Sequence, residues 1–87
     1  SKLDKELQDY YENYFSLFQH AGWKQLMEDL EDTEDSFNLI NIKDAKELHF
    51  AQGQLHILTQ LLSWQDSMNN AYDNNKLEES YQPTNLQ

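Results

Sequence analysis

Apolar residues recur along this 87-residue chain at steps of three and four, which is the period of an amphipathic α-helix. The first such segment covers residues 3–18, and its apolar face is wider than a narrow two-stranded seam needs. A turn at His20-Ala21-Gly22 follows, where Gly22 suits the position just beyond a helix C-terminus and His20 can cap the first helix. The apolar face combines two stripes, namely Leu3, Leu7, Tyr10, Tyr14 and Leu17, and beside them Tyr11, Phe15 and Phe18.

A second amphipathic helix is predicted from residue 23 to about residue 38. Its apolar side holds Trp23, Leu26, Leu30, Thr33 and Phe37, with Met27 beside them. Its opposite face is acidic and holds Glu28, Asp29, Glu31, Asp32, Glu34 and Asp35. The pattern is lost within "LINIKDAKE", where Asn41 or Asp44 suits an N-cap, and Asp44 with Glu47 has the spacing of a capping box.

The third and longest predicted helix covers residues 43–74 and carries two apolar stripes. One consists of Leu48, Ala51, Leu55, Leu58 and Leu62, and the other of Phe50, Ile57, Leu61, Trp64, Met68 and Ala71. A helix with two apolar stripes contacts two neighbours, or one neighbour and another subunit. Residues 75–87 are polar, contain the only proline and are predicted to form an extended or mobile tail.

The chain shows neither strand alternation nor an internal repeat, so we predict an all-α protein with one helical domain over residues 1–74. The simplest arrangement is three helices, of which the second and third form a hairpin. Gly53 within the third helix costs about 0.5–1 kcal/mol relative to Ala. We expect it to admit a large ring such as that of Trp23 or Tyr14; the alternative is that the glycine is merely tolerated. The residues predicted to pack the hairpin are Trp23, Leu30, Phe50, Gly53, Leu55, Leu58 and Trp64.

Charge and composition exclude several classes of protein. Six lysines stand against 16 acidic residues, and the net charge of −10 disfavours direct binding to nucleic acid. The longest apolar runs are far below the roughly 20 residues of a membrane span, so no membrane partner is expected. An aromatic content of 13% nevertheless indicates an acidic protein that folds, alone or on a partner.

Candidate chemistry is sparse. Cysteine and arginine are absent, and no nucleophile grouping or phosphate loop occurs, so we expect neither an enzyme nor a bound cofactor. His49 and His56 lie about 10.5 Å apart along the predicted helix, too far to chelate one metal ion. The acidic run 28–35 lacks the glycine of a calcium loop. It is either a solvated face, or a surface that docks on a basic partner or imitates nucleic acid.

The aromatic residues near the N-terminus are the strongest candidates for a protein interface. Five large rings lie within residues 10–18, more than one amphipathic helix can hide in so small a bundle. Tyrosine and phenylalanine are favoured anchors of interfaces. The residues predicted to face another chain are Tyr10, Tyr14, Phe15 and Phe18.

Two motifs resemble small proteins of tailed, particularly short-tailed, bacteriophages. One is Gly22-Trp23-Lys24; the other is an Asp-x-x-x-Leu-His-Phe-x-x-Gly-Gln block over residues 44–54, and the likeness extends over about residues 15–72. It implies a virion or assembly protein of the head or connector module. Together with the two-striped third helix and the aromatic excess, it leads us to expect several copies docked through apolar helix faces on capsid, portal or connector proteins. It would reside in the virion, and in the host cytoplasm during assembly. Two alternatives remain open: an acidic phage inhibitor of a host protein, and a scaffold present only during assembly.

Overall fold

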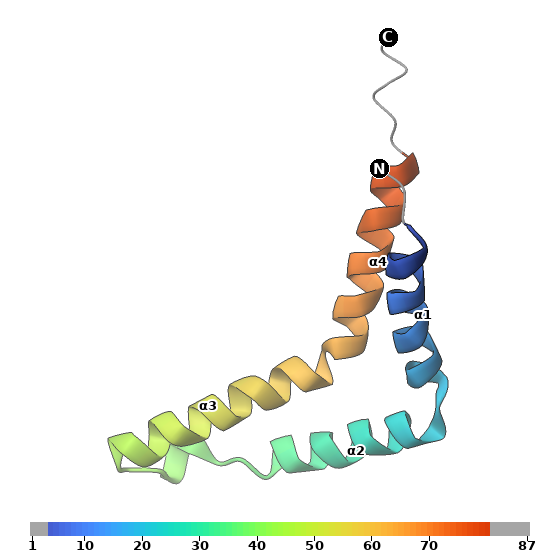
Figure 1. Ribbon diagram of the computed structural model, residues 1–87. Coiled ribbons are helices and arrows are strands. Elements are labelled where there is room, and N and C mark those ends of the chain that lie inside the picture. The colour runs from blue at the N-terminus through green and yellow to red at the C-terminus, as the bar shows by residue number, and fades with distance from the viewer. Residues whose placement is uncertain (1–3, 81–87) are drawn as a thin grey trace.

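The computed structural model describes residues 4–80, and the regular structure of this part is entirely helical (Figure 1). The elements are α1 (Lys5–Gln19), α2 (Ala21–Asp35), the short 3₁₀ turn η1 (Leu39–Asn41), α3 (Ala45–Leu62) and α4 (Trp64–Ser80). The predicted all-α class is confirmed. The predicted count of three helices is wrong, because the segment expected to form one long helix forms α3 and α4.

Local hydrogen bonds explain where two of the helices begin. The Asp4 carboxylate accepts a hydrogen bond from the Leu7 amide at 2.8 Å and caps α1. Asp44 accepts from the Lys46 amide at 2.8 Å and from the Glu47 amide at 3.4 Å, so of the two predicted N-cap candidates it is Asp44 that caps α3. Each carboxylate satisfies amide donors that have no partner within the first helical turn.

The turn between α1 and α2 differs from the prediction. His20 does close α1, since its amide donates to the Leu17 carbonyl at 3.0 Å, but its Nδ1 atom accepts from the Gly22 amide at 2.8 Å and caps α2. Gly22 therefore lies in the first turn of α2 rather than just beyond α1. A Cβ atom at Gly22 would lie 3.0 Å from His20 Nδ1, so the imidazole cap requires this residue to be small.

The break between α3 and α4 falls at Ser63, whose φ and ψ of −98° and 8° leave the helical region. The Ser63 hydroxyl donates to the Gln60 carbonyl at 3.2 Å, which competes with the regular helical pattern. Beyond the break, α4 turns to follow α1 (Figure 1). Residues 75–80, predicted as the start of the tail, continue α4, and the rest of that predicted tail lies outside the described residues.

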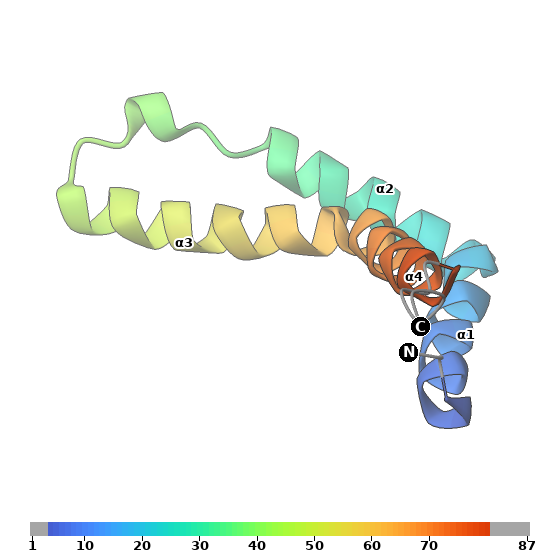
Figure 2. The same cartoon turned by 90° about the horizontal axis from the view of Figure 1, so that it is seen from above.

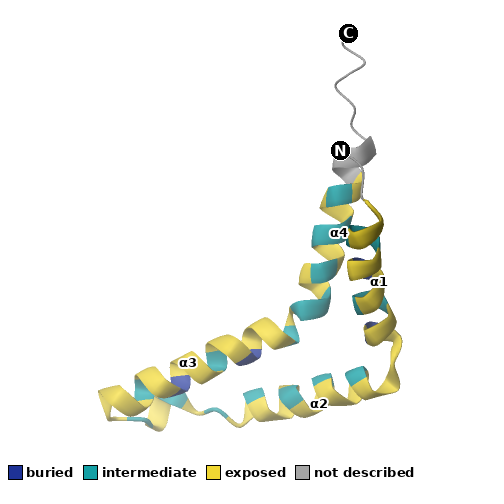
Figure 3. Ribbon diagram, in the orientation of Figure 1, coloured by how far each residue is buried: buried dark blue, intermediate teal, exposed yellow. Residues whose placement is uncertain are grey.

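The four helices form two antiparallel pairs that meet at an angle, with α1 beside α4 in one arm and α2 along α3 in the other (Figures 1 and 2). The hairpin predicted for the second and third helices is thus present. The radius of gyration is 18.9 Å, whereas a compact chain of this length has one of about 12 Å. Burial is correspondingly slight (Figure 3), and the buried apolar residues are Tyr11, Phe18, Ala51 and Leu58.

Candidate protein-docking surface

The N-terminal aromatic residues are largely used inside the chain. The Tyr72 ring on α4 lies 5.2 Å from that of Tyr11 and 5.1 Å from that of Phe15, in both cases edge to face. The Tyr11 hydroxyl also accepts a hydrogen bond from Asn75 Nδ2 at 3.0 Å. Aromatic pairs of this geometry stabilise a fold beyond the area that they bury. This cluster holds α1 against α4, and the sequence prediction had no separate α4 to receive it.

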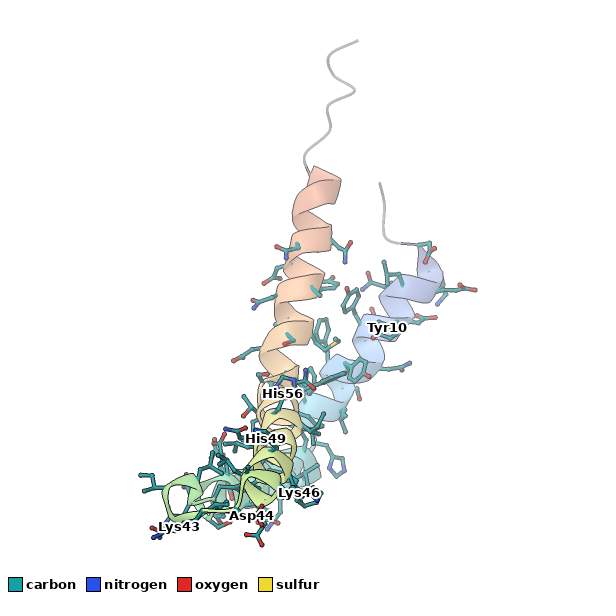
Figure 4. The ribbon with its side chains drawn as sticks, turned by 90° about the vertical axis from the view of Figure 1, so that its left-hand side faces the viewer. Tyr10, Lys43, Asp44, Lys46, His49 and His56 are labelled. Carbon is teal, nitrogen blue, oxygen red and sulfur yellow. The ribbon has the colours of Figure 1, made fainter. Side chains whose placement is uncertain are left out.

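The predicted partner-facing set is therefore only partly exposed. Phe18 is 3% exposed and its ring lies 5.0 Å from that of Trp23, so its assignment to an interface is wrong. Tyr14 and Phe15 are half-buried. Tyr10, 47% exposed on the outer part of α1, is the member that keeps a large accessible ring (Figure 4).

The residues predicted to pack the hairpin likewise differ in how far they are buried. Leu58 is buried, and Leu30 and Leu55 are half-buried. Two tryptophans lie at the corner where the arms meet. Trp23 donates from Nε1 to Gln65 Oε1 at 3.3 Å, and the Trp64 ring lies 6.3 Å from that of Tyr14. Trp23 of α2 thus connects the two arms, whereas Trp64 packs within the arm formed by α1 and α4.

Phe50 and Gly53 do not pack the hairpin, contrary to the prediction. Phe50 is 70% exposed, and an added Cβ at Gly53 would meet no atom within 4 Å. No ring approaches this glycine, so nothing within the described part of the chain requires its missing side chain. The reason is that α3 turns its other apolar stripe toward α2, and Phe50 belongs to the second stripe.

This second stripe borders an open apolar groove of about 740 Å³ between α3 and the end of α2. On the α3 side, three side chains keep much of their surface in water: Phe50 is 70%, Ile57 54% and Leu61 42% exposed. Thr33 and Phe37 line the opposite side. The complete lining is Thr33, Phe37, His49, Phe50, Gly53, Gln54, Ile57, Leu58 and Leu61. We call these residues the docking face.

The carboxylates of α2 are separate from this face. Glu28, Asp29, Glu31, Asp32 and Asp35 are exposed, Glu34 is half-buried, and none of the six lines the groove. Within residues 4–80 the structure contains one salt bridge, between Lys5 and Asp9 of α1, at 3.2 Å. The acidic face is thus not neutralised by lysines of the described chain. In contrast, residues 48–65, which provide the α3 side of the groove, contain no Asp, Glu, Lys or Arg.

The histidines of the described residues do not belong to a cluster of metal-ligating side chains. His49 and His56 are both exposed along α3 (Figure 4), and the described residues contain no group of three or more His, Asp or Glu side chains suited to hold a metal ion. None of the described helices combines the length and the apolar character needed to cross a membrane. What the described surface offers is an apolar face suited to contact with protein.

Comparison with protein-family models, with curated proteins and with solved structures finds no match for this chain.

Proposed function

We propose that this chain is a non-enzymatic structural or assembly protein that works in several copies and docks onto other proteins through apolar helix faces. One observation carries the proposal: a continuous apolar groove remains open, while only four apolar residues are buried among those whose burial the structure describes. Exposed apolar patches of this kind mark sites of protein contact. A small chain gains stability when such a face is covered.

The energy available at the docking face is substantial for a chain of this size. Full burial of a large apolar side chain contributes about 1.5–3 kcal/mol. Scaled by the exposed fractions of Phe50, Ile57 and Leu61, covering these three side chains contributes roughly 2.5–5 kcal/mol. Micromolar affinity corresponds to about 8 kcal/mol, so these three residues supply roughly a third to three fifths of it.

The phage-like motifs supply the biological setting of this proposal. In that setting the protein belongs to the virion or its assembly, and its larger partners are capsid, portal or connector proteins. The test is quantitative mass spectrometry of purified mature and immature particles from the phage that encodes the chain. Several copies per mature particle are expected. Presence in immature particles alone would instead identify a scaffold, and absence from both would refute the proposal.

A second candidate function rests on the acidic face. Five exposed carboxylates along α2 support an inhibitor that binds the nucleic-acid site of a host protein. Binding of this kind weakens steeply with added salt and is lost when residues 28–35 carry Gln and Asn in place of Glu and Asp. The matched control is Ile57→Glu, which alters the docking face and leaves the acidic face intact. Binding that survives neutralisation of the acidic face excludes this candidate.

A further inference from the structure

The docking face combines two helices that present apolar residues on the same side. On α3, Phe50 and Ile57 are seven residues apart and Leu61 follows four residues later, so the three lie along one stripe. On α2, the exposed Leu26 lies seven residues before Thr33, which places it in line with the groove, and the exposed Asp29 lies on the same stripe between them. A helical hairpin that exposes apolar residues along one side resembles half of a four-helix bundle.

Charge determines what can approach this face. The chain carries a net charge of −10, so two copies repel each other over most of their surfaces. Contact through the outer side of α2 would bring five exposed carboxylates against five more. Contact through residues 48–62 of α3 brings together two stretches of 15 residues that carry no acidic or basic side chain other than histidine. The repulsion between two copies is therefore smallest at the docking face.

The exposed area of the chain is also large enough for a contact between two copies. The accessible surface is 7013 Å², whereas a compact monomer of 10.4 kDa exposes about 5,400 Å². Half of this difference already equals the roughly 800 Å² that each partner contributes to a standard interface. One contact of ordinary size between two copies thus removes about half of the excess exposed area of each copy.

We propose that the docking face binds a second copy of this chain, with the two α3 helices packed antiparallel across a twofold axis. The stripe from Phe50 to Leu61 is about 16 Å long, and its midpoint lies between Leu55 and His56. The twofold axis then places Phe50 of one copy beside Leu61 of the other, and Gln54 beside Ile57. Two α2–α3 hairpins form a four-helix bundle, while the acidic side of α2 and Tyr10 remain outside for larger partners.

This inference rests on the proposed function and names the first partner of its docking surface. Sedimentation equilibrium of the full 87-residue chain from micromolar to millimolar concentration tests it. Ile57→Glu places a carboxylate in the stripe of both copies, whereas His56→Glu adds the same negative charge one residue away, outside the groove lining. We expect a wild-type dimer that His56→Glu preserves and that Ile57→Glu weakens about 100-fold, since a tenfold loss in each copy corresponds to ~1.4 kcal/mol.

A second measurement locates the contact. The chain contains no cysteine, so Gln54→Cys introduces a single thiol near the twofold axis, and Gln60→Cys introduces one at an exposed position outside the groove lining. A short bifunctional thiol reagent should join two copies through position 54 and not through position 60. Circular dichroism checks that all variants keep the helical content of the wild type.

Two results would overturn the inference: a wild-type chain that stays monomeric at millimolar concentration, or a dimer that Ile57→Glu leaves intact. Neither result bears on the presence of the protein in phage particles. Absence from particles, conversely, would refute the proposed function without altering the measured dimer. The two failures are therefore distinguishable.

Discussion

The two glycines of the chain provide a matched test of the helix structure, because the fold assigns them opposite roles. Gly53 lies inside α3 with open space around the position of a Cβ atom, and neither glycine has a positive φ. Alanine at a helix interior is about 0.8–1 kcal/mol more favourable than glycine. Gly53→Ala should therefore stabilise the monomer by that amount. For a domain of this size, 1 kcal/mol raises the melting temperature by about 4–8 °C.

Gly22→Ala serves as the contrasting variant. The added methyl group would lie 3.0 Å from His20 Nδ1 and 3.3 Å from His20 Cε1, so the imidazole has to shift by a few tenths of an ångström, which weakens its cap of α2. Loss of a side-chain N-cap costs about 0.5–2 kcal/mol, which offsets the gain in helix propensity. We expect no rise in melting temperature for Gly22→Ala, and a fall of a few degrees where the cap outweighs the gain.

The assay is thermal unfolding followed by circular dichroism at 222 nm. It is performed at dilutions where the midpoint no longer depends on protein concentration, so that association does not contribute. A lower midpoint for Gly53→Ala would show that another group packs against this glycine within one chain. That result would refute the arrangement of α2 and α3 described above.

Three further outcomes are expected. In dilute solution Phe18→Ala should lower the free energy of unfolding, measured in urea, by about 3–5 kcal/mol, because Phe18 is 3% exposed. Phe50→Ala should change the same free energy by less than about 0.5 kcal/mol, because Phe50 is 70% exposed. Equal losses for the two variants would contradict the assigned burial. Tyr11→Phe removes the acceptor of the Asn75 side chain and should cost about 1 kcal/mol in the same assay, while Tyr10→Phe, at an exposed position, should cost almost nothing. Added salt should strengthen self-association in sedimentation experiments, since it screens the repulsion between two acidic copies, and weakening by salt would indicate a contact made by opposite charges.

The features that the sequence predicted correctly depend on residues close together in the chain. Asp44 caps α3 through amides two and three residues away, and the 3.6-residue period of the apolar positions predicts helices. The break at Ser63 has no comparable local signal, since the apolar pattern continues through it. The direction of α4 depends on contacts distant in sequence, such as that between Tyr14 and Trp64, 50 residues apart.

The docking face, too, could be predicted only in part from the sequence. Periodicity revealed two apolar stripes on the segment containing α3 and indicated that one of them meets another neighbour or subunit. It did not determine which stripe turns toward α2, and Phe50 was therefore assigned to the hairpin. The pattern also places the aromatic residues of α1 at an interface, because it runs on from α3 into α4 and does not reveal that α4 is a separate helix that covers them. Both errors arise from tertiary contacts that a local pattern does not contain.

The most direct test of the central claim measures the accessibility of Phe50 itself by hydroxyl-radical footprinting at increasing protein concentration. Dilute chains should be oxidised readily at Phe50, which is 70% exposed, and at Tyr10, which is 47% exposed. As copies associate, the oxidation of Phe50 should fall several-fold while that of Tyr10 stays constant. Oxidation of Phe50 that remains unchanged up to millimolar concentration would contradict the claim that a second copy covers the docking face.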